Sequence, residues 1–346
     1  MASINPSPRG RLLVASCQSG AEMATAVMAA SPFEDGTGAK LLTGLDDRFS
    51  DGETIVRLHR DVSGNDVFLF QAIYDPTSPR TVDENYMAFW IAARAFREWG
   101  ANHVTAVLPY LAYARQDKPS SFEYEPTTAK LTADFTRTAG IDRLITWHPH
   151  LREIHGFYGE TPVHSLDALK LFVHLFADFA GREDVVAVAP DAGASKFITH
   201  FGRALNVACA IASKYRPRPE EAVVNEIIGD VRRHRVAIVV DDMISSGGTM
   251  VALVKKLAAE GIEEIYVGVS HNLCQPTSLE GLIDLHENYG LRRLIVTNTI
   301  PQTSSFLELP FLEVYDLAPI FAQAIFRIHY NEPLQDLFPF PTLEEA

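Results

Sequence analysis

Short apolar runs alternate with amphipathic segments along the first half of the chain. The runs are typical of buried strands, and the segments between them place apolar residues at helical spacing. Strands are predicted at Arg11 to Ser16, Val67 to Gln71, His103 to Leu108 and Arg143 to Trp147, and helices at Ala21 to Ala30, Asp83 to Trp99, Thr127 to Ala139 and Leu166 to Ala180. Strands that alternate with helices predict mainly parallel sheets with helices on both faces.

The second half of the chain repeats this rhythm. Strands are predicted at Val185 to Ala189, Asn206 to Ile211, Val223 to Ile228, Arg235 to Val240, Ile265 to Ser270 and Leu294 to Asn298. One helix is predicted to run from after Gly193 to about Leu205, and others are predicted at Met250 to Glu260, Ser278 to Tyr289 and Pro319 to His329. The repetition predicts two similar doubly wound α/β domains, residues 1–165 and 166–317. Residues 318–346 are expected to form a C-terminal helix and tail that pack back on the N-terminal domain.

The composition is that of an acidic globular protein. The chain has 346 residues, a hydrophobic fraction of 47% and a formal net charge of −14. Because nucleic-acid backbones require a basic face, a broad nucleic-acid-binding surface is not expected. Its three cysteines form no disulfide framework and no zinc spacing, and no apolar run is long enough to span a membrane. These features suit a protein of the reducing cytoplasm without nucleic-acid or membrane partners.

One stretch combines an acidic pair with a loop of small residues. Asp241 and Asp242 follow a predicted strand, and the next predicted helix begins at Met250. The residues between them include Ser245, Ser246, Gly247, Gly248 and Thr249. A helix N-terminus offers N–H groups to an anion, and glycines let the backbone approach it closely. Carboxylates accept hydrogen bonds from hydroxyls, so this stretch predicts a site for a phosphorylated sugar. The alternative is an acidic turn before an ordinary capped helix.

Polar residues follow other predicted strands. Arg115, Gln116 and Asp117 lie in a loop after the strand that ends at Leu108, where they could border phosphates or could form an ordinary solvated loop. His150 and Asp191 also follow strand ends. An imidazole and a carboxylate at neighbouring strand ends could hold Mg²⁺, with at most one of His148 and His150 bound directly and the other in an outer role. The alternative is that these residues only cap the strands.

Two further loops carry charge. Lys214 and Arg216 lie in a basic segment whose two prolines, Pro217 and Pro219, are expected to keep it out of helix and sheet. Such a loop could close over a transferring phosphoryl group, or could simply be exposed. In the other loop, Phe49 stands near two carboxylates, Asp51 and Glu53, and could stack on a nucleotide base or form a surface turn.

Together these segments resemble the ribose-phosphate pyrophosphokinase (PRPP synthetase) family, which has a type I phosphoribosyltransferase-like fold. The resemblance runs from about Leu12 to Phe338. Its most specific segments are Arg48 to Glu53, Pro109 to Lys118, Pro190 to Asp191 and Val240 to Thr249. Ser245 and Ser246 stand where most bacterial and animal members have Asp-Thr, and this serine version is closer to the archaeal-type variant.

The resemblance implies a role for each cluster. The N-terminal domain would bind ATP through Arg115, Gln116 and Asp117. Phe49, Asp51 and Glu53 would complete the adenine pocket of a neighbouring subunit, which implies a homo-oligomer. The C-terminal domain would bind ribose 5-phosphate through the segment from Asp241 to Thr249. His150 and Asp191 would associate with Mg²⁺, and Lys214 and Arg216 would form the basic pair of a catalytic loop.

The implied activity is transfer of the β,γ-diphosphoryl group of Mg-ATP to ribose 5-phosphate, which gives PRPP and AMP. Two alternatives stay open at this point. One is a phosphoribosyltransferase that consumes PRPP, because the segment from Asp241 to Thr249 fits both activities. The other is a non-catalytic regulatory homologue of the family.

Overall fold

The computed structural model describes residues 9–33, 38–119, 124–218, 221–335 and 337. The chain divides into two compact units. Unit 1 comprises Met1–Leu166 and Asp316–Pro339, and unit 2 comprises Asp167–Tyr315 and Phe340–Ala346. Part of the predicted loop after Ala114, residues 120–123, lies outside the described residues, as does most of the predicted C-terminal tail.

Unit 1 is built on a parallel sheet of six strands in the order β2-β1-β5-β6-β7-β8. The strands are β1 (Arg11–Ser16), β2 (Lys40–Leu42), β5 (Asn65–Phe70), β6 (His103–Val107), β7 (Arg143–Trp147) and β8 (Val163–Leu166). A separate antiparallel hairpin is formed by β3 (Asp46–Arg48) and β4 (Thr54–Val56). The helices are α1 (Ala21–Ala29), α2 (Val82–Glu98), α3 (Thr128–Thr138) and α9 (Ala318–His329), with 3-10 turns η1 (Gln18–Gly20) and η2 (Arg152–Tyr158).

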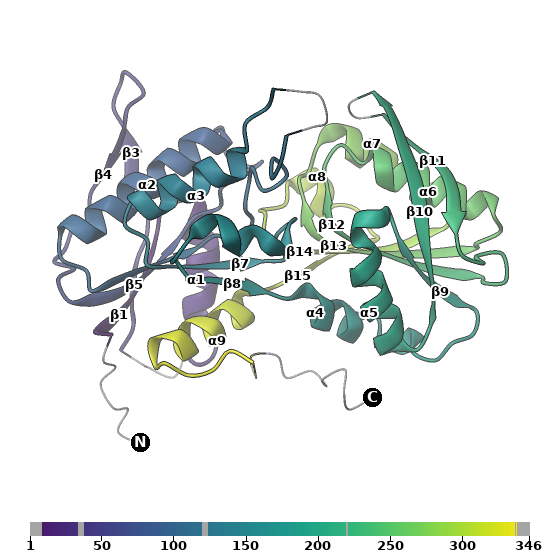
Figure 1. Ribbon diagram of the computed structural model, residues 1–346. Coiled ribbons are helices and arrows are strands. Elements are labelled where there is room, and N and C mark those ends of the chain that lie inside the picture. The colour runs from purple at the N-terminus through teal and green to yellow at the C-terminus, as the bar shows by residue number, and fades with distance from the viewer. Residues whose placement is uncertain (1–8, 34–37, 120–123, 219–220, 336, 338–346) are drawn as a thin grey trace. The chain divides into compact units, whose positions relative to one another are not determined.

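Helices cover both faces of this sheet. Helices α2 and α3 lie on one face, and α1 and α9 on the other (Figure 1). The C-terminal helix α9 is held by aromatic contacts, since the ring of Phe321 packs edge-on against Phe70, with 6.3 Å between centroids. It is also held by a buried hydrogen bond of 2.8 Å between His329 Nδ1 and Asp66 Oδ2. Residues far along the chain thus complete the core of unit 1.

Unit 2 is built on a sheet of seven strands in the order β11-β10-β9-β12-β13-β14-β15. The strands are β9 (Val185–Ala189), β10 (Ala208–Arg218), β11 (Glu221–Ile228), β12 (Val236–Ile244), β13 (Glu264–Asn272), β14 (Leu291–Thr297) and β15 (Leu312–Tyr315). All neighbours are parallel except β10 and β11. The helices are α4 (Ala168–Leu175), α5 (Ser195–Leu205), α6 (Gly248–Ala259), α7 (Pro276–Asn288) and α8 (Ser304–Leu307), with turns η3 (Ala177–Phe179) and η4 (Ala192–Ala194).

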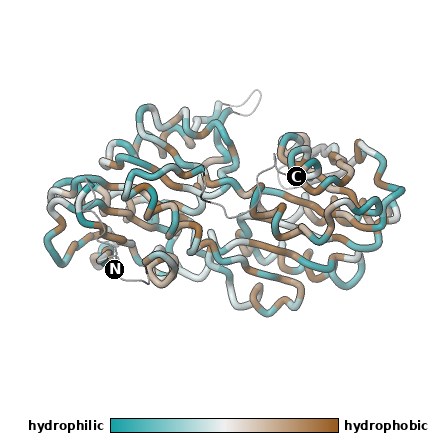
Figure 2. The backbone as a smooth tube through the Cα atoms, turned by 90° about the horizontal axis from the view of Figure 1, so that it is seen from below, coloured by the Kyte–Doolittle hydropathy of each residue, from teal (hydrophilic) through white to brown (hydrophobic). Residues whose placement is uncertain are grey.

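The predicted α/β class with mainly parallel, doubly wound sheets is confirmed. Within each unit, apolar positions concentrate along the sheet strands and hydrophilic ones along the outer turns (Figure 2). Strand β9 illustrates the cause, because all of its residues are apolar and buried, as expected of a strand covered on both faces. Over the described part of the chain, no helix combines the length and the apolar character needed to cross a membrane.

The prediction that prolines keep the Lys214 segment out of the sheet is wrong. Strand β10 continues to Arg218 and pairs with β11, so Lys214 lies opposite Val224. Within the described part of the chain, β10 beyond Ile211 pairs only with β11. Pro217 falls where the register between Tyr215 and Arg218 shifts. A proline is tolerated at such an irregularity of a two-stranded ribbon, because no ladder N–H is lost there.

His164 predicts a pH dependence of stability. Its Nε2 lies 2.6 Å from Arg143 Nη1, and burial followed by the Arg143 charge lowers the pKa of His164 from 6.5 to about 4. Between these two pKa values the unfolded chain binds more protons than the folded chain. The contribution of His164 to stability is therefore fully present above pH 6.5 and is lost as the pH drops toward about 4. We expect His164→Gln to reduce the loss of Tm between neutral and acidic pH by a few degrees. The control is His155→Gln, a change at an exposed histidine of the same unit. If Tm depends on pH in the same way in both variants, His164 is not the source of the pH dependence.

Candidate active site

The order of strands in unit 2 reverses between β9 and β12. From β9 the chain passes through α5 to β10 on one side, whereas from β12 it passes through α6 to β13 on the other. Ligands of open parallel sheets bind at the carboxyl ends of strands where the order reverses in this way. Asp191 follows β9, and Asp241 and Asp242 lie near the end of β12. The topology therefore brings three predicted site residues to one edge of the sheet.

The three carboxyl groups interact electrostatically. Burial raises the pKa of Asp241 well above its ordinary value, and the nearby charges of Asp242 and Asp191 raise it further. The N–H of Asp242 donates to Asp241 Oδ1 at 2.9 Å, and the N–H of Gly193 donates to Asp191 Oδ1 at 2.8 Å. Like charges at this edge disfavour further negative charge, so the site favours hydroxyl donors or a cation between the carboxylates.

The acidic pair lies inside the strand, and the prediction that β12 ends at Val240 is wrong. The ladder with β13 continues through Asp241, opposite Val269, and Met243, opposite His271. Because β13 itself continues as an extended chain to Asn272, it supplies partners for these residues. The carboxylates are therefore fixed by a regular sheet and not by a turn.

The loop after β12 leads directly into α6. Gly247 is the N-cap of α6, adopts a φ of +83°, and gives the helix no side-chain cap. Gly248 and Thr249 belong to the first turn of the helix, so α6 begins two residues before the predicted start at Met250. The carbonyl oxygen of Ser246 accepts a hydrogen bond from Thr277 Oγ1 at 3.2 Å. First-turn N–H groups without a side-chain cap are suited to bind an anion.

A buried polar group beside this edge was not predicted from the sequence. His271 Nδ1 lies 2.9 Å from Thr299 Oγ1, and Asn272 Nδ2 donates to Gln302 Oε1 at 2.8 Å. His271 and Asn272 are the last residues of β13, which neighbours β12, whereas Thr299 and Gln302 follow β14 on the other side of β13. In the sequence, the change from apolar to polar residues after Val269 could have indicated this polar group. The contacts fix the end of β13 beside the acidic pair.

In unit 1, the loop after β6 carries three predicted ATP-binding residues. Arg115 and Gln116 are exposed and Asp117 is half-buried. The loop is attached to α2, because Tyr86 Oη donates to the carbonyl of Ala112 at 3.0 Å and Tyr113 Oη hydrogen-bonds to Asp83. That second bond is the main cause that raises the pKa of Tyr113 to about 12. These tyrosines therefore act as anchors and leave Arg115 and Gln116 exposed.

The end of β7 lies beside this loop. The N–H of Trp147 donates to the carbonyl of Pro109 at 3.2 Å, which joins the two strand ends. His148 adopts a φ of +38° and is half-buried, whereas His150 is exposed. The polar residues that follow β6 and β7 therefore share the carboxyl edge of the unit 1 sheet.

The predicted Phe49 loop is the turn of the β3–β4 hairpin. The N–H of Phe49 donates to the carbonyl of Glu53 at 2.9 Å, and the N–H of Gly52 donates to that of Phe49 at 3.0 Å. The N–H of Glu53 donates to Asp51 Oδ1 at 3.1 Å. Although the turn is closed by these bonds, the Phe49 ring is 48% exposed. An exposed ring on an ordered turn is available to a ligand or a partner.

The predicted site residues divide between the two units. Asp191 and the segment from Asp241 to Thr249 belong to unit 2, as do Lys214 and Arg216, whose side chains lie outside the described ones. His150 and the predicted ATP-binding residues belong to unit 1. Among the described residues, no group of three or more histidine, cysteine, aspartate or glutamate side chains could hold a metal ion by itself. The proposed pairing of His150 with Asp191 at one metal stays a prediction.

Comparison with known proteins covers most of the chain. Residues 12–140 match the N-terminal domain of ribose phosphate pyrophosphokinase, and residues 186–339 match the phosphoribosyl synthetase-associated domain. The chain is 36% identical over 292 residues to the ribose-phosphate pyrophosphokinase of Clostridium acetobutylicum, an alignment that covers 84% of this chain and 88% of that protein. It is 35% identical over 309 residues to the ribose-phosphate pyrophosphokinase of Caldanaerobacter subterraneus, with 89% and 94% covered.

A solved structure shows the same fold. The phosphoribosylpyrophosphate synthetase of Mycobacterium smegmatis aligns with a TM-score of 0.79 at 28% sequence identity, over 93% of this chain and 99% of that one. The expected family and fold are therefore confirmed. The chain belongs to the ribose-phosphate pyrophosphokinase family.

Proposed function

We propose that the protein is a ribose-phosphate diphosphokinase that transfers the β,γ-diphosphoryl group of Mg-ATP to the anomeric hydroxyl of ribose 5-phosphate. The products are PRPP and AMP. The observation that carries the proposal is the carboxyl edge of β9 and β12, where an acidic pair precedes the N-terminus of α6, which has no side-chain cap. The names of the family relatives support the same activity.

Unit 2 is proposed to bind ribose 5-phosphate. The N–H groups at the start of α6, with the hydroxyls of Ser245, Ser246 and Thr249, would hold the 5-phosphate. Asp241 and Asp242 would accept hydrogen bonds from the 2- and 3-hydroxyls of the sugar. Each such bond to a charged group contributes about 2 kcal/mol. The anomeric carbon would then lie at the sheet edge near Asp191.

Unit 1 is proposed to bind ATP. Arg115 and Gln116 are exposed at the carboxyl edge of its sheet, beside Asp117, and can donate to phosphate or ribose oxygens. Phe49, Asp51 and Glu53 would complete the adenine pocket of a neighbouring subunit, which makes the protein a homo-oligomer. Phe49 can offer a ring face to the base, and the two carboxylates can accept from its amino group.

The donor set at the carboxyl edge of unit 2 fits Mg²⁺. This ion prefers oxygen ligands and is usually held by one or two carboxylates together with substrate phosphates, so a cage of three protein ligands is not needed. Asp191 in unit 2 and His150 in unit 1 are each proposed to associate with Mg²⁺. A bound Mg²⁺ would neutralise negative charge on the transferring phosphates.

Catalysis then consists mainly of positioning and charge stabilisation. The oxygen of the anomeric hydroxyl forms a bond to the β-phosphorus, the bond to the α-phosphate oxygen breaks in line with it, and AMP leaves. Lys214 and Arg216 are proposed to stabilise the charge that spreads over the transferring group. No side chain is assigned as a general base. The proposed location is the cytoplasm, which suits three free cysteines.

A combined assay tests the proposal. The protein is incubated with Mg-ATP and ribose 5-phosphate, and AMP and PRPP are quantified together. Equal amounts of both products are expected, because each transfer releases one AMP. Absence of AMP from folded protein would refute the activity and favour a regulatory homologue. Consumption of added PRPP with a base, without use of ATP, would identify a phosphoribosyltransferase, an alternative that the comparisons do not favour.

A further inference from the structure

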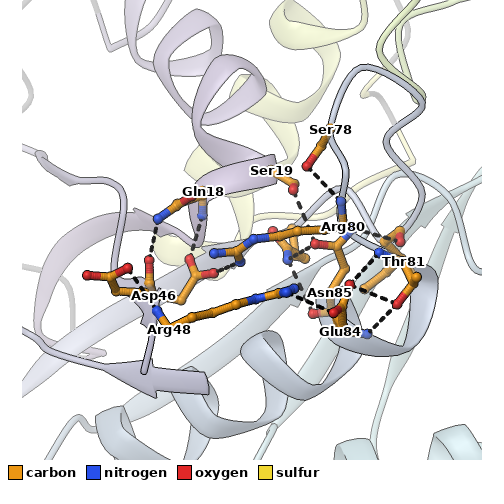
Figure 3. A network of polar contacts seen from close by, with 12 residues as sticks. Gln18, Ser19, Asp46, Arg48, Ser78, Arg80, Thr81, Glu84 and Asn85 are labelled. Atoms are coloured by element: carbon orange, nitrogen blue, oxygen red, sulfur yellow. Dashed lines mark hydrogen bonds and ion pairs between the residues drawn. The ribbon is translucent and has the colours of Figure 1, made fainter. Parts of the chain in front are cut away.

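A buried polar network lies at the base of the β3–β4 hairpin in unit 1 (Figure 3). Asp46 is the first residue of β3, and its side chain is fully buried. One carboxylate oxygen accepts the N–H of Gln18 at 2.6 Å, and the other forms an ion pair with Arg80, whose side chain is 10% exposed. A carboxylate buried this deeply requires its cation, because an unpaired buried charge is strongly destabilising.

The same network attaches the hairpin to the sheet. Gln18 Nε2 donates to the carbonyl of Asp46 at 2.5 Å, and the N–H of Leu45 donates to the carbonyl of Ser16 at 3.3 Å. Ser16 ends β1, which neighbours β5 at the point where the strand order of unit 1 reverses. The base of the hairpin is therefore tied to the ligand-facing edge of the sheet.

A second attachment lies close to the first. Arg48 Nη1 forms an ion pair of 2.8 Å with Glu84 Oε1, and Glu84 also accepts the N–H of Thr81 at 2.7 Å within the capping box of α2. The bond from Arg48, followed by those from Thr81, lowers the pKa of Glu84 to about 2. Because Thr81 directly follows Arg80, both attachments end on the short segment that starts α2. They hold opposite ends of β3.

The two attachments affect the position of the turn that follows β3. Arg48 is succeeded at once by Phe49, and the turn to Glu53 is closed by its own hydrogen bonds. A rotation or shift at the base of the hairpin would therefore carry the whole turn with it. The hairpin also belongs to a two-stranded sheet separate from the main sheet, so strand pairing with the main sheet does not fix its position.

We propose that Arg80 is a positioning residue for nucleotide binding. Through Asp46 it fixes the base of the β3–β4 hairpin, and thereby the place at which Phe49, Asp51 and Glu53 meet ATP. This inference rests on the proposed function, in which that turn contacts the adenine. Because the side chain of Arg80 is buried against Asp46, we assign it no direct contact with substrate, and its loss should lower the affinity for ATP but not that for ribose 5-phosphate.

Kinetics of Arg80→Met test the proposal. We expect the KM for ATP to rise by about tenfold, since small displacements of a contacting group have large effects. The KM for ribose 5-phosphate and the kcat at saturating ATP should change less than about twofold. Titration calorimetry with ATP should show the same loss of affinity as the kinetics. Arg80→Lys, which keeps the charge beside Asp46, should recover most of the affinity.

Arg9→Met is the matched control. Arg9 pairs with Asp66 in the same unit, and the exposures of its side chain and of its partner, 10% and 0%, equal those of Arg80 and Asp46. That pair lies at the amino ends of β1 and β5, away from the hairpin. Arg9→Met should lose less stability in thermal melts than Arg80→Met, because Asp66 keeps its bond to His329. Only Arg80→Met should weaken ATP binding.

The possible outcomes distinguish the positioning role of Arg80 from the proposed function. Active wild-type protein whose Arg80→Met variant keeps its KM for ATP would overturn the positioning role alone. Wild-type protein that neither binds ATP nor releases AMP would overturn the proposed function itself. If Arg80→Met does not fold, Arg48→Met replaces it, because the Arg48–Glu84 pair is partly exposed. Arg48→Met should raise the KM for ATP by a smaller factor than Arg80→Met. An unchanged KM for ATP would refute the inference that the attachments of the hairpin position its turn for nucleotide binding.

Discussion

Lys214→Ala should lower kcat by about 10³-fold and leave the affinity for ATP nearly unchanged. A cation that meets a transferring phosphoryl group stabilises charge that develops mainly in the transition state, so its removal affects turnover much more than binding. The backbone of Lys214 belongs to β10, in a hairpin with β11 that extends from the sheet of unit 2. Steady-state kinetics together with ATP calorimetry check this separation of kcat from affinity.

The controls address charge and folding. Lys214→Arg keeps a cation and should retain more activity than Lys214→Ala. Lys255→Ala removes one positive charge from the same unit at a surface ion pair with Asp284, and should behave as wild type. A kcat of Lys214→Ala within a few-fold of wild type would remove Lys214 from the catalytic residues.

Local pattern was sufficient for most elements of the fold. Strand β9 was predicted with its observed ends, because an apolar run is bounded by Asp184 and Pro190. Strand β12 was predicted too short, because Asp241 and Asp242 look like a loop when their partner strand is not known. The ladder with β13 is a long-range interaction, and it overrides the local preference of an acidic pair.

The site was predictable only in part, for the same reason. Asp191 and Asp241 could be expected near each other, since both follow parallel strands whose carboxyl ends share one edge. The Arg80–Asp46 pair joins residues 34 positions apart, and no spacing rule indicates it. Lys214 was predicted outside the sheet from two prolines alone, yet pairing with β11 decides the conformation of that segment.

Gly247→Ala should raise the KM for ribose 5-phosphate by on the order of 10²-fold, because it displaces the N-terminus of α6. Two effects combine at this position. The φ of +83° is unfavourable for alanine by about 1 kcal/mol. In addition, a Cβ would lie 2.9 Å from Ser278 Cβ, so the loop or α7 must move. The KM for ATP should stay near its wild-type value, because the proposed ATP-binding residues belong to unit 1.

Gly261→Ala separates backbone strain from displacement of the loop. Gly261 follows the other end of α6 with a φ of +100°, but a Cβ there meets no atom within 4 Å. Gly261→Ala should lose only the stability that backbone strain costs, and should therefore lose less than Gly247→Ala and keep its KM for ribose 5-phosphate. If the two variants show the same KM for ribose 5-phosphate and the same Tm, contact of the loop with Ser278 does not determine the geometry of the proposed sugar-phosphate site. If only Gly247→Ala loses affinity for ribose 5-phosphate, the close approach of α6 and α7 holds in place the N–H groups that are proposed to bind phosphate.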